Sequence, residues 1–303
     1  MQQRSNSPES TRVLAAAAIT ILAAALSACG GGGNSGSSSG GTPTATVSAI
    51  VVNATKYGSA ATVTINGTGL DTTLAVSSSV CTGMTIQSGS TATSATYSCM
   101  VHGGLTGTVI AKSNGTQVGS ATLTVPAPIV RLAINNGLSA VGNIDVTLSP
   151  DKVPNTVDNF LGYVNTHWYD NTIFHRIVAG FVAQAGGYSA PVTNLSTATL
   201  KSGLSSPITY EAGGLSHTTG TIAMAATSTG AETSQFFFDL ANNTNLDGAY
   251  TAFGTITAGS SVLAAITAAP ATCQVITIDS AGDTETDCLP NPNVVVTTAT
   301  QIQ

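Results

Sequence analysis

The chain has 303 residues, which is enough for one to three domains with a sizeable core. Only 7% of the residues are charged, and 14 acidic residues against 8 basic ones give a formal net charge of −6. Low charge combined with many β-branched residues favours β structure in an exported protein over a disordered acidic tail. The basic residues form no cluster along the sequence, so we expect no nucleic acid partner.

Residues 1–29 have the pattern of an export signal. Arg4 and Arg12 accompany an apolar run, Val13 to Leu26, that is too short to span a bilayer comfortably. The run ends in LSAC at residues 26–29, which resembles the processing box of bacterial lipoproteins. In that class the cysteine is acylated and becomes the first residue, so we expect a lipid anchor on Cys29. The alternative is an ordinary secretory signal that contains a cysteine by chance.

The residues after Cys29 indicate a location and a linker. Gly30, rather than Asp, follows the cysteine, and by resemblance to Gram-negative lipoproteins this favours the outer membrane. We therefore expect a lipid-anchored protein of the bacterial cell envelope that faces the periplasm. Residues 30–44 are rich in Gly and Ser, which is typical of a flexible linker between the membrane and the folded part.

Residues 45–126 contain short segments of alternating character that are separated by turn signals, among them Asn66-Gly67 and Asn114-Gly115. Closely spaced short strands over this length favour a β-sandwich, and the segment resembles bacterial immunoglobulin-like modules. It shows no catalytic constellation, so we interpret it as a spacer or adhesion module. The expected strands are Thr46–Val51, Thr62–Ile65, Thr96–Val101, Thr108–Ala111 and Ala121–Val125.

Residues 128–303 form a second predicted domain after the boundary Pro126-Ala127-Pro128. Apolar residues three and four apart predict a helix over Asn155–Thr166, and a second helix is expected at Ser260–Thr267. Two helices among many strands favour a barrel that is capped at its ends. The expected strands are Ile129–Ile134, Asn143–Leu148, Ile173–Ala179, Phe181–Ala183, Thr221–Ala225, Gln235–Leu240 and Ala252–Ile256.

Four cysteines remain after Cys29, and they fall into two local pairs, one in each predicted domain. Export places them in an oxidising compartment, where an even number favours disulfides over free buried thiols. We predict the disulfides Cys81–Cys99 and Cys273–Cys288. Neither pair has C-x-x-C spacing, so we expect no redox or zinc role.

Only two arginines remain after removal of residues 1–29, and one of them, Arg176, lies in the apolar segment FHRIVAGFVAQAGG at 174–187. A structural ion pair with one of the twelve acidic residues in 128–303 would explain this arginine taken alone. Alternation along a strand would place Phe181 and Ala183 on one face, with Val182 and Gln184 on the other. Aromatic, aliphatic, amide and guanidinium groups within so short a span suit a bound peptide.

The same segment resembles the cyclophilin signature F-H-R-x-x-x-x-F-x-x-Q-x-G. Three further segments resemble cyclophilin motifs in family order, over roughly residues 128–270: PNTVDNF at 154–160 with WYDNT at 168–172, GTIAMA at 220–225 with SQFFF at 234–238, and NLDGAY at 245–250 with FG at 253–254. The resemblance implies a closed eight-stranded antiparallel barrel with two capping helices, in a chain that is mainly β. It also implies that the chain isomerises prolyl peptide bonds.

The family's working residues can be assigned to matching positions. Arg176 matches the catalytic arginine, and Gln184 matches the glutamine that holds the substrate backbone. His175 matches the histidine before the arginine, for which a packed structural role is the simpler interpretation. The remaining substrate-binding positions are the proline pocket walls Phe181, Phe237 and Leu246, the neighbouring subsite Met224 and Ala225, Val182 where methionine is common, and Tyr250 where animal members have histidine.

Two positions depart from the family pattern. Asn245 replaces the aromatic residue that borders the pocket and contacts cyclosporin, which puts cyclosporin sensitivity in doubt. Ala226 replaces an asparagine whose backbone makes the usual contact. Neither change removes the proposed catalyst.

The implied reaction needs no metal, nucleophile or cofactor. Rotation about an X–Pro bond must overcome a barrier of about 18–20 kcal/mol, and the prolyl nitrogen gains a lone pair as the bond twists. A guanidinium directed at that nitrogen would bind the twisted state more strongly than either planar state. General acid–base chemistry is the weaker interpretation, because Asp239 and Asp247 show no paired histidine or catalytic spacing in the sequence.

We therefore expect a monomeric isomerase that acts on proline-containing polypeptides and assists the folding of envelope or secreted proteins. The first alternative is a catalytically weak peptide-binding or chaperone-like surface lipoprotein, to which Asn245 gives some room. The second is a structural or adhesive surface protein, which explains residues 45–126 but not Arg176.

Overall fold

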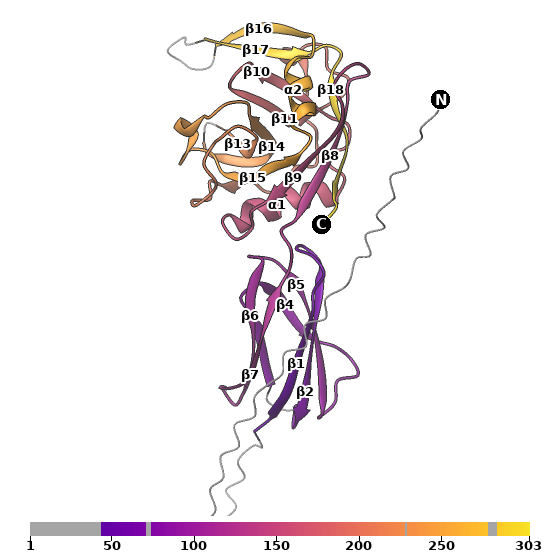
Figure 1. Cartoon of the computed structure of the whole chain (residues 1–303), viewed down its shortest axis with the longest axis vertical. Coiled ribbons are helices and arrows are strands. Elements are labelled where there is room, and N and C mark those ends of the chain that lie inside the picture. The colour runs from indigo at the N-terminus through magenta and orange to yellow at the C-terminus, as the bar shows by residue number, and fades with distance from the viewer. Residues whose placement is uncertain (1–43, 71–73, 228, 278–283) are drawn as a thin grey trace, which may run out of the picture. The chain divides into compact units, whose positions relative to one another are not determined.

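The computed structural model describes residues 44–70, 74–227, 229–277 and 284–303, so the predicted signal, Cys29 and most of the linker lie outside the described residues. The first strands form two antiparallel sheets, with orders β1-β2-β5-β4 and β3-β6-β7 (Figure 1). All five expected strands of residues 45–126 are present, and β3 and β4 are additional. The strands are β1 Thr46–Asn53, β2 Ala60–Thr68, β3 Leu74–Ser78, β4 Cys81–Ile86, β5 Ser94–Val101, β6 Thr106–Ser113 and β7 Thr116–Thr124.

The two turn signals behave differently. Asn114 and Gly115 join β6 to β7 with φ values of +50° and +80°, as the prediction requires. Asn66-Gly67, in contrast, lies within β2, so the predicted turn there is wrong. A Cβ on Gly67 would lie 1.8 Å from the Thr46 carbonyl oxygen, and the β1–β2 register shifts at this point. Glycine is therefore needed for close strand approach at a bulge rather than for a turn.

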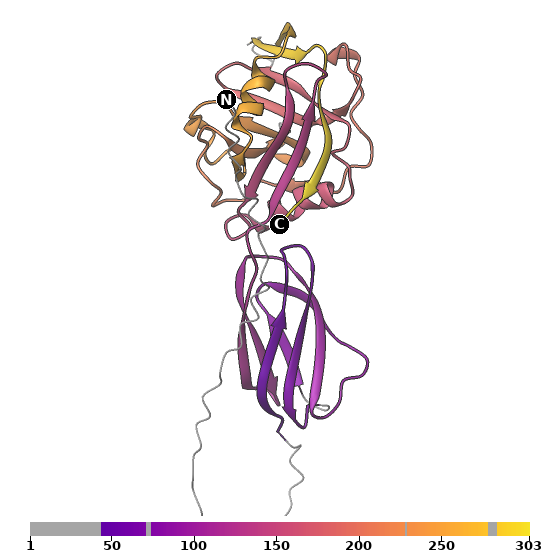
Figure 2. The same ribbon diagram turned by 45° about the vertical axis from the view of Figure 1, so that its right-hand side comes forward.

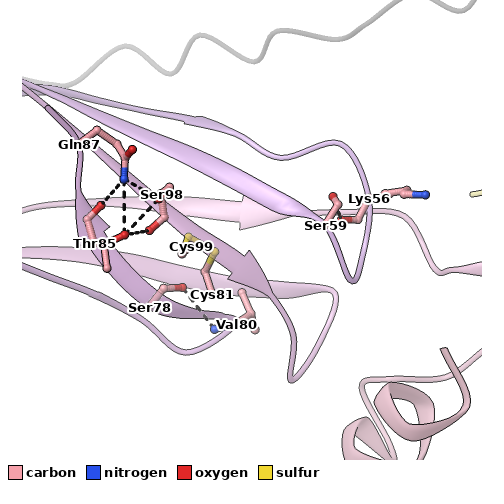
Figure 3. The surroundings of a disulfide bond; sticks show 9 residues. All are labelled: Lys56, Ser59, Ser78, Val80, Cys81, Thr85, Gln87, Ser98 and Cys99. Atoms are coloured by element: carbon pink, nitrogen blue, oxygen red, sulfur yellow. Dashed lines mark hydrogen bonds between the residues drawn. A yellow bond between two sulfur atoms is a disulfide. The ribbon is translucent and has the colours of Figure 1, made fainter. Parts of the chain in front are cut away.

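The predicted disulfide Cys81–Cys99 is confirmed, and it links β4 to the neighbouring β5 (Figure 3). Both cysteines are buried, so the bridge belongs to the core of this part of the chain. On the exposed side of the same strands, the Gln87 amide donates to the Ser98 hydroxyl at 2.7 Å, and Thr85 lies 3.2 Å from that hydroxyl.

Eight of the remaining strands build a closed antiparallel barrel. The hydrogen-bonded order is β11-β14-β13-β15-β9-β8-β18-β10, and pairing of β10 with β11 closes the ring. Figure 2 shows the magenta β8 and β9 running beside the yellow β18. The barrel strands are β8 Ile129–Asn135, β9 Val141–Leu148, β10 Thr172–Val178, β11 Val182–Ser189, β13 Thr221–Ala226, β14 Ala231–Asp239, β15 Ala252–Ala258 and β18 Val294–Gln301, and the short β12 Ile208–Thr209 pairs with β14.

Both predicted helices are present, as α1 Pro154–Asn165 and α2 Ser260–Thr267. Proline occupies the first turn of α1, where its missing N–H costs nothing. The apolar face of α1 is buried as its spacing predicts, and Phe160 packs against the aromatic rings of Tyr169, Phe236 and Phe253. Two single turns of 3-10 helix, η1 Leu195–Thr197 and η2 Thr244–Leu246, lie in loops.

A β-hairpin precedes the last barrel strand and was not predicted. It consists of β16 Ala271–Thr277 and β17 Thr284–Pro290 (Figure 1). The predicted disulfide Cys273–Cys288 is confirmed and joins these two strands. β17 also pairs with β10, where Ile177 lies opposite Cys288. Because β17 reads TETDCLP, it lacks the apolar alternation from which a strand would be predicted.

Within the described residues, no helix combines the length and apolar character that crossing a membrane requires.

Candidate active site

Five adjacent barrel strands carry one continuous row of cross-strand neighbours. Arg176 on β10 lies opposite Gln184 on β11, and Gln184 lies opposite Phe237 on β14. Phe237 in turn lies opposite Ala223 on β13, which lies opposite Ala252 on β15. Directly opposed residues share a sheet face, so the barrel places a cation, an amide and an aromatic ring side by side.

An apolar patch continues this row beyond Gln184. Its buried members are Val182, Phe237, Ala223 and Ala252, and its partly exposed members are Phe181, Leu215, Ala225, Leu246 and Tyr250. The ring of Tyr250 meets Phe237 edge to face, with ring centroids 5.7 Å apart. The structure thus brings together six predicted substrate-binding residues: Phe181, Val182, Ala225, Phe237, Leu246 and Tyr250.

Phe181 reaches the patch in a way that simple alternation does not predict. β11 begins at Val182, and Phe181 lies in the preceding turn, where its N–H donates to the Val178 carbonyl at 3.0 Å. Phe181 and Val182 therefore both face the patch, although alternation placed them on opposite faces. The Phe181 carbonyl accepts hydrogen bonds from Leu240 N–H and from the Asn243 amide, which fix the turn.

Met224 differs from the other predicted residues. Along β13, Ala223 and Ala225 belong to the patch, whereas Met224 between them is fully buried in the main core. Its side chain does not border the patch in this arrangement. The predicted contact between Met224 and substrate stays a prediction.

Arg176 is held by polar groups on two sides. Its Nε donates to Asp287 Oδ1 on β17 at 2.7 Å, and its Nη1 donates to Gln184 Oε1 at 3.4 Å. Gln184 Nε2 donates in turn to Gln235 Oε1 on β14 at 2.8 Å. The sequence contained a signal for Gln235, because it alternates with the inward-facing Phe236 in the SQFFF segment. No signal identified Asp287.

A buried histidine–aspartate pair supports the patch from beneath, and sequence reasoning missed it. His217 Nδ1 lies 2.9 Å from Asp239 Oδ2, and the His217 ring stacks on Phe237. The inference that Asp239 lacks a paired histidine is therefore wrong, whereas Asp247 accepts the backbone N–H of His217 rather than a ring N–H. His217 precedes Asp239 by 22 residues in the sequence. The loop before β13 places it beside the end of β14, where Asp239 lies.

The environment of His217 favours its charged form. Burial lowers the pKa of His217, but hydrogen bonds to Asp239 and to the Tyr250 carbonyl, with the nearby carboxylates, raise it above its ordinary value. Both side chains of the His217–Asp239 pair are fully buried, and His217 Nε2 lies 3.2 Å from the Tyr250 carbonyl oxygen. This arrangement leaves the pair no direct access to a substrate, so we interpret it as support for Phe237 and Tyr250.

His175, next to the predicted catalyst, is buried and packs edge to face on Tyr188. Burial, reinforced by the Arg176 charge, lowers the pKa of His175 to about 4, although hydrogen bonds to the Ile173 backbone and the Gln235 side chain oppose the shift. His175 is therefore neutral at physiological pH, which is consistent with the structural role expected of it.

A cavity of about 360 Å³ borders Arg176, and Gln184 and Gln235 also line it. The hairpin contributes Thr272, Asp287 and Leu289 to its wall, and the barrel contributes His175, Arg176 and Tyr188. We call this space the hairpin cavity. Arg176 and Gln184 thus border both features, the apolar patch of the barrel and the mixed cavity beneath the hairpin.

Comparison with known proteins identifies relatives of the barrel. Residues 129–299 match the family described as cyclophilin type peptidyl-prolyl cis-trans isomerase/CLD. The chain is 41% identical over 118 residues to peptidyl-prolyl cis-trans isomerase A of Dickeya dadantii, a match that covers 38% of this chain and 58% of that protein. It is 38% identical over 137 residues to a peptidyl-prolyl cis-trans isomerase of Acinetobacter baylyi, covering 43% of this chain and 69% of that protein.

Among solved structures, a cyclophilin type peptidyl-prolyl cis-trans isomerase of Cryptosporidium parvum aligns with a TM-score of 0.43 and 21% identity, over 59% of this chain and 99% of that one. The family match extends over more than half of the sequence and includes the whole Arg176–Gln184–Phe237 row. The chain belongs to the cyclophilin type peptidyl-prolyl cis-trans isomerase family.

Proposed function

We propose that the chain catalyses cis–trans isomerisation of X–Pro peptide bonds in exported polypeptides. The observation that carries the proposal is the cross-strand row in which Arg176 and Gln184 lie directly beside the apolar patch. An apolar surface for a proline ring and donors for the adjacent backbone are the two components that this reaction requires.

In this proposal, the proline ring packs on Phe181, Phe237 and Leu246 of the patch. Gln184 holds the substrate backbone through its amide, and the Arg176 guanidinium lies near the prolyl nitrogen. Val182, Ala225 and Tyr250 complete the binding surface, whereas the contact with Met224 is proposed from the family resemblance alone. Because the ring is held while the other side of the bond rotates, the enzyme binds the twisted state more tightly than the planar states.

The energetics divide the work between the patch and Arg176. A guanidinium is charged at all physiological pH values, and its hydrogen bond to the pyramidal nitrogen would contribute about 1.5–3 kcal/mol. A rate gain of about 10⁵ requires roughly 7 kcal/mol, so the larger part must come from water exclusion and ring binding at the patch. No proton is transferred in this scheme, so it assigns no chemical step to the His217–Asp239 pair.

The direct test is an isomerisation assay of the unmutated, purified protein on a short X–Pro peptide. The expected result is acceleration of cis–trans exchange in proportion to enzyme concentration. Peptide binding without any acceleration would replace the proposal with the catalytically weak peptide-binding protein, an outcome for which Asn245 at the exposed rim gives some support.

We further propose an envelope location and a two-domain organisation. Cys29 carries the lipid anchor, residues 30–44 are the linker, residues 45–126 form an immunoglobulin-like spacer and residues 128–303 form the isomerase, which acts as a monomer at the periplasmic face of the outer membrane. Two disulfides support an oxidising compartment. Cys29→Ser should release the protein from the membrane fraction or leave it unprocessed; normal processing with retained membrane binding would contradict the anchor.

A further inference from the structure

The ion pair between Arg176 and Asp287 joins the proposed catalyst to the hairpin. The Nε–Oδ1 distance is 2.7 Å, and the two side chains are 17% and 8% exposed. Partial burial of both groups strengthens such a pair relative to an exposed one, because less water competes for the charges. The contact is also distant in sequence, at a separation of 111 residues, so it depends on how the hairpin is placed.

Three features fix Asp287 at this position. Ile177, the residue after Arg176, pairs with Cys288, the residue after Asp287, across β10 and β17. The Cys273–Cys288 disulfide ties β17 to β16, and Asn291 N–H donates to the Pro270 carbonyl at 2.7 Å to close the base of the hairpin. The disulfide and the pairing with β10 therefore both fix Cys288, the residue next to Asp287.

The register of β17 directs Asp287 toward the barrel. Successive side chains of a strand point to opposite faces, so Asp287 and Leu289 share a face, and Cys288 points the other way. Asp287 and Leu289 are both buried and both line the hairpin cavity, with Thr272 from the opposite strand. The hairpin face that lines the cavity is thus also the face from which the Asp287 carboxylate contacts Arg176.

Strand order shows from which side Asp287 reaches the guanidinium. Across the sheet the strand order is β17, β10, β11 and β14. The residues Asp287, Arg176, Gln184 and Phe237 therefore follow one another in space in this order. Asp287 therefore approaches Arg176 from the side opposite the apolar patch. A carboxylate in this position orients the guanidinium without covering the surface on which a proline ring would pack.

We propose that Asp287 is a positioning residue for Arg176, held in place by the disulfide-linked hairpin. Asp287 fixes Nε and Gln184 receives Nη1, so two acceptors on two different strands set the plane and the rotation of the guanidinium. This inference rests on the proposed isomerase function. It adds that the active-site geometry depends on the hairpin as well as on the barrel.

The kinetic test compares Asp287→Ala and Asp287→Asn with the unmutated protein. Asp287→Ala should lower kcat about tenfold, which corresponds to about 1.4 kcal/mol, with KM changed by less than about twofold because the patch is intact. Asp287→Asn keeps an oxygen acceptor for Nε and should recover most of the lost kcat. This split between kcat and KM, and the recovery by Asn, would not follow from a merely structural role.

Asp145→Ala is the matched control, because Asp145 forms the other Arg–Asp pair of the barrel, with Arg131 Nε at 2.8 Å. Its kinetics should equal those of the unmutated protein. A rise in kcat for Asp287→Ala would mean that Asp287 restrains the enzyme and would overturn the proposal, as would kinetics equal to those of the control. An inactive unmutated protein would instead overturn the proposed function itself.

A direct readout of the side chain is available because the chain contains only four arginines: Arg4, Arg12, Arg131 and Arg176. In ¹⁵N-arginine-labelled protein, Asp287→Ala should shift or broaden the Arg176 Nε–H signal and leave the Arg131 signal unchanged. Arg131→Lys and Arg176→Lys assign the two signals. An unchanged Arg176 signal in Asp287→Ala would overturn the positioning role, whatever the kinetics.

Discussion

On the Gln184 side of Arg176, the cross-strand row of Gln184, Phe237 and Ala223 comes from barrel strands and lies in motifs that the sequence displays. On the β17 side, the neighbours come from a hairpin whose sequence resembles no motif and no regular strand. The first side is placed by strand registers that continue from β10 to β14. Among the described residues, the second depends on the pairing of Ile177 with Cys288, the Cys273–Cys288 disulfide and the Arg176–Asp287 ion pair. One site therefore combines a row of residues in recognisable motifs with a support whose sequence carries no such motif.

Because of this difference, variants on the two sides should change different kinetic parameters. Changes on the patch side should alter substrate binding, because that surface packs the proline ring. Changes on the hairpin side should alter turnover with little effect on binding, because they act through the orientation of Arg176.

Removal of the Arg176 guanidinium, which lies between the patch and the hairpin, should have the largest effect on activity. Arg176→Ala should lower kcat/KM by about tenfold to a hundredfold, or about 1.4–2.7 kcal/mol in the activation free energy. The fold should survive, since Arg176 lies opposite Gln184 on the face of the sheet that is not packed in the main core. Arg131→Ala, which breaks the exposed pair with Asp145, should keep full activity. Full activity of Arg176→Ala on a proline peptide would show that the proposed mechanism is wrong.

Sequence reasoning predicted the patch side well, because its residues are local to recognisable segments. Phe181, Phe237 and Leu246 could be assigned from their motifs, and the structure gathers them in one cluster. Prediction failed where function depends on distant pairing. Asp287 contacts Arg176 across 111 residues, and His217 contacts Asp239 across 22, and neither contact leaves a periodic or spacing signal.

A change confined to the patch should affect binding first. Phe181→Ala removes one wall for the proline ring, so KM should rise and kcat/KM should fall about tenfold, or about 1.4 kcal/mol. Phe181 is only partly buried, so the loss of unfolding free energy should stay near about 1–2 kcal/mol. Val141→Ala, which trims a residue that is 54% exposed on β9, is the control for both measurements. A fall in kcat at unchanged KM would contradict the division between the two sides.

Opening the hairpin should have a smaller effect on turnover. Cys273→Ser combined with Cys288→Ser removes a cross-link with a sequence separation of 15, worth about 3 kcal/mol in the chain-entropy model. The hairpin then keeps its strand pairings and the ion pair but loses the cross-link next to Asp287, so Asp287 should be less well fixed and kcat should fall about threefold. The matched control is Cys81→Ser with Cys99→Ser, which removes the other disulfide. It should lower thermal stability and leave kcat unchanged, and equal losses of kcat in both variants would refute the link between the hairpin and Arg176.

The last prediction concerns the stability of the fold as a function of pH, not turnover, and it has opposite signs at two buried titratable groups. Glu232 of β14 is fully buried; Thr251 donates to its Oε1 at 2.9 Å, and its Oε2 has no hydrogen-bond partner in the part of the chain that the structure describes. Burial raises the pKa of Glu232 to about 7, although the Thr251 hydrogen bonds oppose the shift. Burial instead lowers the pKa of His175 to about 4.

The signs follow from proton linkage. The folded state binds the Glu232 proton more tightly than the unfolded state, so this contribution to stability is complete below about pH 4.5 and is lost as the pH rises to about 7. The His175 contribution runs the other way: it is complete above about pH 6.5 and is lost as the pH falls to about 4. Glu232→Gln keeps the acceptor for Thr251 and cannot ionise. Thermal unfolding from pH 4 to 8 should therefore show the variant gaining Tm relative to the unmutated protein only toward the alkaline end, while the acid-side loss due to His175 stays the same in both proteins. A Tm difference that did not grow with pH would show that Glu232 ionises in the folded state as readily as in the unfolded one, and the contrast between the two groups would then rest on His175 alone.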